Sequence, residues 1–216
     1  MNKSRTALII LIAVMTMAFA AIPSSGAEEI KRLYFEDVGV SLEMPDSVQY
    51  ITMDMIKNHS FPNNSDFSFE EYREYFEQNN IYVLGYMGDE DGAITVRIQE
   101  APSGLTLTND DPTLTLYYQN IIAISFLRMS LKDAGYIVWD YNVYEGEKYP
   151  GIWFHNEYYD GTPHYSITYV LIEDGRMIQL TANIPGVKQE FPEDREQIIR
   201  EIFNTIQVDP LPETGV

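Results

Sequence analysis

The chain contains no cysteine and only three histidines, and its 14 Lys and Arg residues stand against 33 Asp and Glu. Without cysteine it forms no disulfide, offers no thiol nucleophile and has no thiol for lipid attachment. A net charge of −19 repels phosphate backbones and anionic lipid headgroups, so nucleic-acid binding is not expected. The same charge favours solubility, cations or a basic partner.

The first 27 residues have the layout of a secretory signal peptide. Lys3 and Arg5 form a basic start, residues 7–22 are apolar except for Thr16, and a short run of small residues follows Pro23. We therefore expect the chain to leave the cytoplasm. Export without cysteine is typical of a bacterial protein, either secreted or held in the cell envelope.

Two positions fit the small-x-small cleavage pattern, after Ala20 and after Ala27. We expect cleavage after Ala27, because Pro23 ends the apolar helix shortly before it. The apolar run is shorter than the roughly 20 residues that a spanning helix needs, so no stable membrane span is expected after cleavage. Removal of the segment takes away two basic residues and no acid, which lowers the net charge from −19 to −21.

The remaining chain is predicted to form a single α+β domain over residues 28–208, with residues 209–216 as a flexible tail. Alternation and turn residues predict strands over 33–35, 38–44, 48–52, 81–87, 93–99, 137–144, 152–159, 164–172 and 177–183. Helices are expected after the capping box of Ser68 and Glu71, over 113–134 and over 193–206. The helix over 113–134 is apolar nearly all round, which predicts burial on more than one side. The expected fold is a mostly antiparallel sheet flanked by helices.

Two stretches resemble domains of the PsbP/Mog1-like fold. Residues 38–45, Val-Gly-Val-Ser-Leu-Glu-Met-Pro, are similar to the strand that opens such domains. Residues 175–181, Gly-Arg-Met-Ile-Gln-Leu-Thr, and residues 198–203, Ile-Ile-Arg-Glu-Ile-Phe, are similar to the closing strand and helix. The resemblance covers most of residues 33–208 in element order. It implies an α/β/α sandwich and a family used mainly for binding and assembly, and it brings no functional residues with it.

A candidate metal site arises from two histidines on neighbouring strands. If Asp160 and Gly161 form a two-residue turn, Glu157 faces His164 and His155 shares their side of the sheet. Two imidazoles and one carboxylate could hold Zn²⁺ or a similar ion. The alternative is a polar sheet face with cross-strand hydrogen bonds, because a change of register by one residue would scatter the three side chains.

Acidic turns at residues 89–92 and 109–111 offer oxygen ligands for Ca²⁺. Neither has the spacing of an EF-hand loop, so solvated turns are expected there. Catalysis is not expected either, because the chain has no Gly-x-Ser-x-Gly elbow and no cysteine. Tyrosine and tryptophan crowd into residues 136–169, and such side chains suit binding surfaces as well as sheet packing. On the assumed register, Trp153 and Tyr159 lie beside the histidines and are candidate ligand contacts.

The chain ends in Leu-Pro-Glu-Thr-Gly at residues 211–215, which resembles the sortase recognition motif of Gram-positive surface proteins. Three interpretations follow. The favoured one is an exported, non-enzymatic binding or assembly-support domain with a protein or cell-envelope ligand. The others are a metal-binding protein that uses His155, Glu157 and His164, and a sortase-anchored surface adhesion module.

Overall fold

The computed structural model describes residues 31–61, 68–86, 92–103, 105, 107, 114–133, 135–159, 163–185 and 193–210. The predicted signal peptide, the acidic turns at 89–91 and 109–111 and the motif at 211–215 lie outside these residues. Within the described part, no helix is long and apolar enough to cross a membrane.

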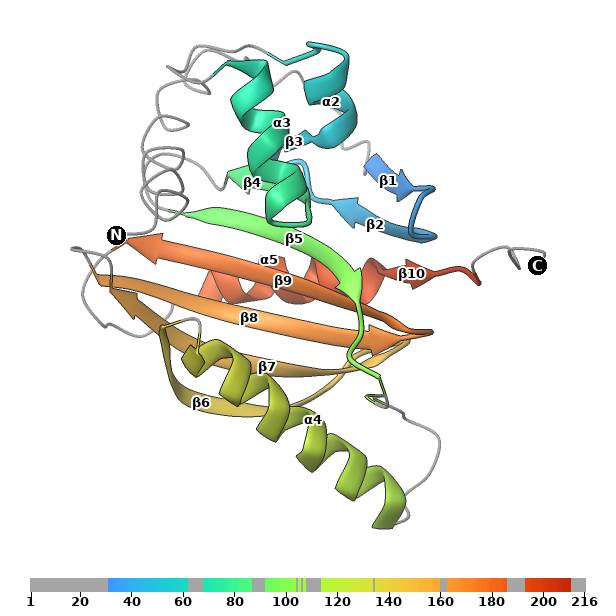
Figure 1. Ribbon diagram of the computed structural model, residues 1–216, viewed down its shortest axis with the longest axis vertical. Coiled ribbons are helices and arrows are strands. Elements are labelled where there is room, and N and C mark those ends of the chain that lie inside the picture. Colours follow the sequence, from blue (N-terminus) through green and yellow to red (C-terminus); the bar gives the residue numbers. More distant parts are fainter. Residues whose placement is uncertain are drawn as a thin grey trace.

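The strands form two antiparallel sheets (Figure 1). The small sheet has the order β1–β2–β10, with bounds Lys31–Phe35, Val40–Met44 and Gln207–Val208. The large sheet has the order β3–β4–β5–β9–β8–β7–β6, with bounds Gln49–Thr52, Ile81–Tyr86, Ala93–Glu100, Arg176–Pro185, Pro163–Glu173, Pro150–Tyr159 and Tyr136–Glu145. The helices are α2 (Met53–Lys57), α3 (Phe69–Gln78), α4 (Leu114–Asp133) and α5 (Glu193–Thr205). A large antiparallel sheet flanked by a few helices confirms the predicted α+β class.

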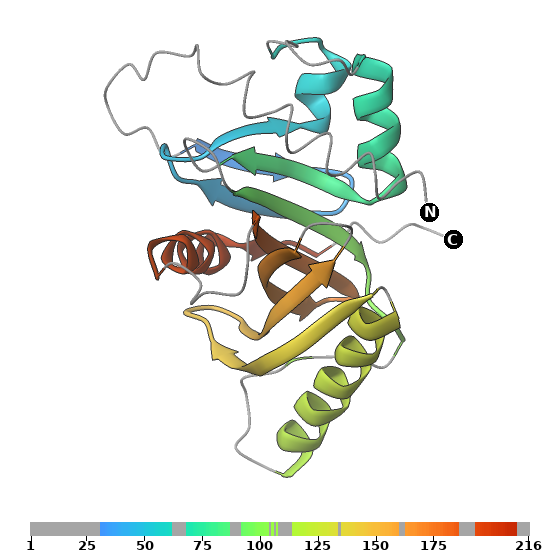
Figure 2. The ribbon, with the colours of Figure 1, turned by 90° about the vertical axis from the view of Figure 1, so that its left-hand side faces the viewer.

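The elements form layers on both faces of the large sheet. Helix α5 and the small sheet lie on one face, whereas α2, α3 and α4 lie on the other (Figures 1 and 2). The main core fills the α5 side and combines residues of β2, β5, β8 and β9 with Ile199, Ile202 and Phe203 of α5. Two smaller clusters lie beneath α2 and α3 and beneath α4.

Several local signals in the sequence form as predicted. Ser68 and Glu71 make the reciprocal hydrogen bonds of a capping box at the start of α3. Gly135 has a φ of 90° after the end of α4, and Asp174 and Gly175 adopt positive φ in the turn from β8 to β9. The five-residue α2 was not predicted, because so short a helix carries no amphipathic period; its start is fixed by Thr52, whose hydroxyl accepts a hydrogen bond from the Met55 N–H.

The C-terminal half of α4, residues 123–133, differs from the prediction of burial on more than one side. Ala123 and Leu127 are buried against the sheet, but Phe126 is 42% exposed and Met129 is 66% exposed. Over residues 123–133, where its side chains are described, the helix packs by a single stripe over β6 and β7 and leaves Phe126 and Met129 on its outer surface.

One buried arginine joins the two sheets. Arg176, at the start of β9, donates hydrogen bonds from Nη1 to the carbonyl oxygens of Val38 at 2.6 Å and Asp209 at 2.7 Å. Its Nη2 forms an ion pair with Asp174. The Asp209 N–H in turn bonds the Gly39 carbonyl at 2.8 Å, so the entry to β2 and the exit from β10 are held at one point of the large sheet.

Candidate functional site

An open hollow of about 580 Å³ lies where the C-terminal end of α5 meets two turns. Its walls come from the end of β2 and the turn into β3, the turn between β6 and β7, and the last two turns of α5. The lining residues are Glu43, Pro45, Asp46, Ser47, Glu147, Glu201, Asn204 and Thr205. We call this region the acidic hollow, because four of its lining residues are carboxylates and none is basic.

The last turn of α5 fixes the walls through two polar side chains. The Thr205 hydroxyl donates to the Ile202 carbonyl at 2.7 Å and accepts from the Glu43 N–H at 2.8 Å. The side-chain amide oxygen of Asn204, Oδ1, accepts from the Glu147 N–H and from the Tyr144 hydroxyl, both at 3.3 Å. The end of the helix is thereby tied to β2 on one side and to the turn between β6 and β7 on the other.

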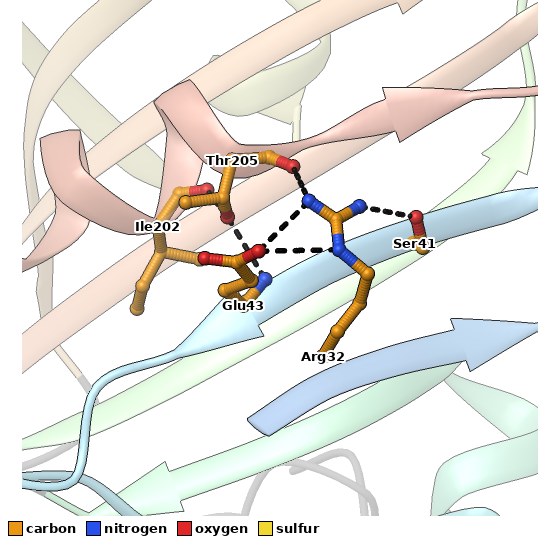
Figure 3. A network of polar contacts seen from close by, with 5 residues as sticks. All are labelled: Arg32, Ser41, Glu43, Ile202 and Thr205. Carbon is orange, nitrogen blue, oxygen red and sulfur yellow. Dashed lines mark hydrogen bonds and ion pairs between the residues drawn. The ribbon is translucent and has the colours of Figure 1, made fainter. Parts of the chain in front are cut away.

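A single guanidinium from β1 reaches this region (Figure 3). Arg32 contacts the Glu43 carboxylate at 3.0 and 3.2 Å and donates to the Ser41 hydroxyl at 2.8 Å. Its third contact, to the Thr205 carbonyl, is long at 3.4 Å. Arg32 and Glu43 lie opposite each other in the register of β1 and β2, so this ion pair follows from the strand pairing.

The electrostatic balance of the hollow is negative. Four carboxylates stand against the one guanidinium that pairs with Glu43. The negative end of the α5 dipole points to the same place, and the last turn of α5 contains no basic residue. The negative charge of Asp46 also affects Tyr50. Burial raises the pKa of the Tyr50 hydroxyl, and the nearby Asp46 carboxylate raises it further.

This geometry suits an organic cation better than a metal ion. In the described part of the chain, no group of three or more His, Asp and Glu side chains is placed to hold a metal. The carboxylates of the acidic hollow are instead spread around an opening whose volume is in the range of small-ligand sites. Lysine and arginine side chains are small enough for such a space, and their N–H donors complement carboxylates.

The predicted histidine cluster is not formed, because the assumed register between β7 and β8 is wrong by one residue. Tyr159 pairs with Pro163, so three residues rather than two separate the paired ends. His155 therefore faces Ile167 instead of Ser166, and His164 faces Tyr158 instead of Glu157. His155 and Glu157 lie on the α5 side of the sheet, and His164 lies on the opposite side.

Of the two candidate ligand contacts, Trp153 has a described side chain and Tyr159 does not. Trp153 lies on the α5 side, half-buried, with its ring centroid 4.9 Å from that of His155. Burial lowers the pKa of His155, with a smaller opposing effect from the carboxylates of Glu196 and Asp140. Tyr159 ends β7, and its side chain is outside the described set.

Sequence reasoning did not single out the residues of the acidic hollow. Glu43, Asp46, Glu147 and Glu201 are scattered over 159 positions of a chain that is rich in acids everywhere. The only signal in the sequence was the overall excess of acid, which favours solubility, cations or a basic partner alike and gives no location. The tertiary fold brings the four together.

Neither a protein family nor a curated protein matches this sequence. Solved structures with a similar fold include cyanobacterial PsbP from Synechocystis sp. PCC 6803, at 13% identity and a TM-score of 0.45, over 88% of this chain and 99% of that one. The Ran-binding protein Mog1p of Saccharomyces cerevisiae is 9% identical, with a TM-score of 0.38, over 84% of this chain and 96% of its own. LpqN of Mycobacterium tuberculosis, involved in cell envelope biogenesis, is 14% identical, with a TM-score of 0.39, over 86% and 93%. These likenesses agree with the resemblance to the PsbP/Mog1-like fold, and at such TM-scores they transfer no role to this chain.

Proposed function

We propose that this chain is an exported, non-enzymatic binding domain whose acidic hollow receives basic side chains of a protein partner. The observation that carries the proposal is the composition of the wall, which combines four carboxylates with a helix C-terminus and has no basic lining residue. Lysine and arginine side chains complement such a wall in charge and in hydrogen-bonding capacity. The signal-peptide pattern of residues 1–27 supports a partner outside the cytoplasm.

The polar groups of the wall support binding rather than chemical conversion. The hydroxyl of Thr205 is already engaged as donor to Ile202 and as acceptor from Glu43. The lining contains no histidine, lysine or cysteine, so it offers no His–Ser, Lys–Ser or Cys–His pair for nucleophilic catalysis. We assign its carboxylates the role of charge-complementary contacts.

A labelled hexalysine peptide tests the proposal by fluorescence anisotropy. The double variant Glu147→Gln with Glu201→Gln removes two exposed carboxylates from the hollow, and Glu74→Gln with Glu77→Gln removes two exposed carboxylates from α3. Exposed ion pairs contribute about 0.2–1 kcal/mol each, so the hollow variant is expected to bind roughly 2- to 30-fold more weakly.

The α3 variant is the matched control, because it changes the net charge by the same amount at another place. It should bind hexalysine as the unchanged protein does at about 150 mM salt, where distant charges are screened. Equal weakening in both variants would show that only net charge attracts the peptide. Absence of binding by the unchanged protein would also reject the proposal.

A further inference from the structure

A second surface lies where the large sheet extends past α5. Helix α5 packs against β2, β9 and β8, whereas α4 packs against β6 from the opposite side (Figure 2). The C-terminal end of α5 does reach these strands, because the Phe203 ring lies 5.2 Å from that of Tyr144 in β6, between centroids, and beside Gly151 of β7. At the opposite end of β6, the α5-facing side is partly open to solvent. Ile137 of β6 lies on this side, opposite Glu157, and is 64% exposed.

Four rings form a connected group on this side, which we call the aromatic face: Trp139, Trp153, His155 and Tyr165. The ring centroids of Trp139 and Tyr165 are 5.0 Å apart, and those of His155 and Tyr165 are 5.9 Å apart. Trp153 is 4.9 Å from His155, and both tryptophans are only partly buried. Tyr165 itself is buried and belongs to the main core, so the two indoles and the His155 ring form the partly exposed part of this group. Partly exposed tryptophans are typical of an interaction surface.

Carboxylates from three elements surround the aromatic face. Asp140 lies opposite His155 in the strand register, Glu157 lies opposite Tyr165, and Glu196 approaches from α5. Burial raises the pKa of the Tyr165 hydroxyl, and all three carboxylates raise it further, so the local potential is negative.

One guanidinium close to these carboxylates, that of Arg200, is already engaged. Arg200 forms an ion pair with Glu196 and donates to the Tyr169 hydroxyl at 3.0 Å. Asp140 and Glu157 form no ion pair within the residues that the structure describes. Two carboxylates beside partly exposed indole rings thus remain for a cation from outside.

The outer edge of β6 is protected against the addition of another strand near its centre. β6 is the last strand in the sheet order, and an unpaired edge of ten residues would invite another strand. The Tyr141 N–H, however, donates to the Asp140 side chain at 2.9 Å, and the Val143 N–H donates to the Asn142 side chain at 2.8 Å. A partner therefore meets the face of the strand rather than its edge.

We propose that the aromatic face binds an arginine side chain of a partner protein, with the guanidinium on the indole rings and paired with Asp140 and Glu157. A guanidinium is planar and weakly hydrated, and it both stacks on aromatic rings and pairs with carboxylates. A second copy of this chain would instead bring like charges together. The aromatic face shares no residue with the acidic hollow, so this proposal does not depend on the proposed function.

Tryptophan fluorescence tests the proposal directly, because Trp139 and Trp153 are the only tryptophans in the chain. The purified protein is titrated with tetra-arginine, and with tetra-citrulline as a neutral peptide of the same shape. Tetra-arginine should produce a saturable change in emission, and tetra-citrulline should produce none. Trp153→Leu should weaken binding roughly 2- to 30-fold, because it removes a cation–π contact that phenylalanine would keep in part.

Charge variants give a second test, because they remove the carboxylates without removing an aromatic ring and are not expected to unfold the protein. Asp140→Asn with Glu157→Gln should weaken tetra-arginine binding roughly 2- to 30-fold. The change at position 140 is not expected to disturb the strand, since the amide oxygen of an asparagine can still accept from the Tyr141 N–H. The α3 variant Glu74→Gln with Glu77→Gln, which removes the same charge elsewhere, should leave the titration unchanged.

Four results would overturn the proposal: an equal response to tetra-citrulline, equal weakening in the α3 variant, no change in emission at saturating tetra-arginine, or a dimer. The dimer would appear in light scattering, with an emission that depends on protein concentration alone, and it would identify a second copy as the occupant. The proposal for the acidic hollow is tested separately, by hexalysine anisotropy with the Glu147→Gln, Glu201→Gln variant.

Discussion

Replacement of the buried Arg176 by methionine should destabilise the fold strongly. The guanidinium is 5% exposed and bonds the carbonyl oxygens of Val38 and Asp209 at 2.6 and 2.7 Å, with a longer contact to Gly39. Hydrogen bonds from a charged group contribute about 1.5–3 kcal/mol each. Methionine recovers part of this by apolar burial, and water can reach the exposed Asp209, so we expect a net loss of about 2–4 kcal/mol.

Urea unfolding measures this loss, with tryptophan emission and far-UV circular dichroism as two independent signals. At about 2–4 °C per kcal/mol for a chain of this size, the melting temperature should fall by roughly 4–16 °C. The matched control is Arg73→Met, which removes an exposed ion pair with Glu70 and should cost about 0–1 kcal/mol. A loss below about 1 kcal/mol in Arg176→Met would show that water or neighbouring groups replace the guanidinium, and would refute the account of how the two sheets are joined.

Three further predictions concern the cap of α3, the alkaline limit of stability and the edge of the sheet. Ser68→Ala should destabilise the protein by about 1 kcal/mol in urea, because it removes the capping box, whereas Ser68→Asp should restore most of the loss. Burial raises the pKa of Tyr75 to about 12 from 10.0, so the stability it contributes is present below pH 10 and is lost as the pH rises towards 12. Tyr75→Phe should therefore lose stability less steeply than the unchanged protein between pH 10 and 12, and identical slopes would contradict this assignment. Asp140→Ala with Asn142→Ala should expose the edge of β6 and raise the rate of aggregation seen by light scattering; an unchanged rate would show that the edge is protected by other means.

Much of the architecture could be predicted because its signals are local. Alternation marked β2, where Val40, Leu42 and Met44 are all buried, and turn residues separated β8 from β9 at Asp174 and Gly175. The packing of α4 could not be predicted in this way. In a helix that is apolar all round, the sequence does not indicate which side faces the sheet. Over residues 123–133, where side chains are described, the sheet covers the side that carries Ala123 and Leu127.

The sites were harder to predict because they depend on pairing between distant segments. The prediction of the histidine cluster was wrong because the connection between β7 and β8 is one residue longer than assumed, which places His164 on the other face of the sheet. The same register kept Trp153 and His155 on one face and placed Tyr165 beside them. The acidic hollow needs β2, the turn after β6 and the end of α5 in contact, and no spacing in the sequence encodes that contact.

Backbone amide shifts in the presence of hexalysine test the central claim most directly. In ¹⁵N-resolved NMR spectra, we expect the peptide to shift the amides of Asp46, Ser47, Glu147 and Glu201, which line the acidic hollow. The amides around Glu74 and Glu77 on α3 should stay in place, although these side chains carry the same charge and are also exposed to solvent. Shifts of similar size at both places, or none at the acidic hollow, would contradict the claim that this hollow is where the protein receives a basic partner.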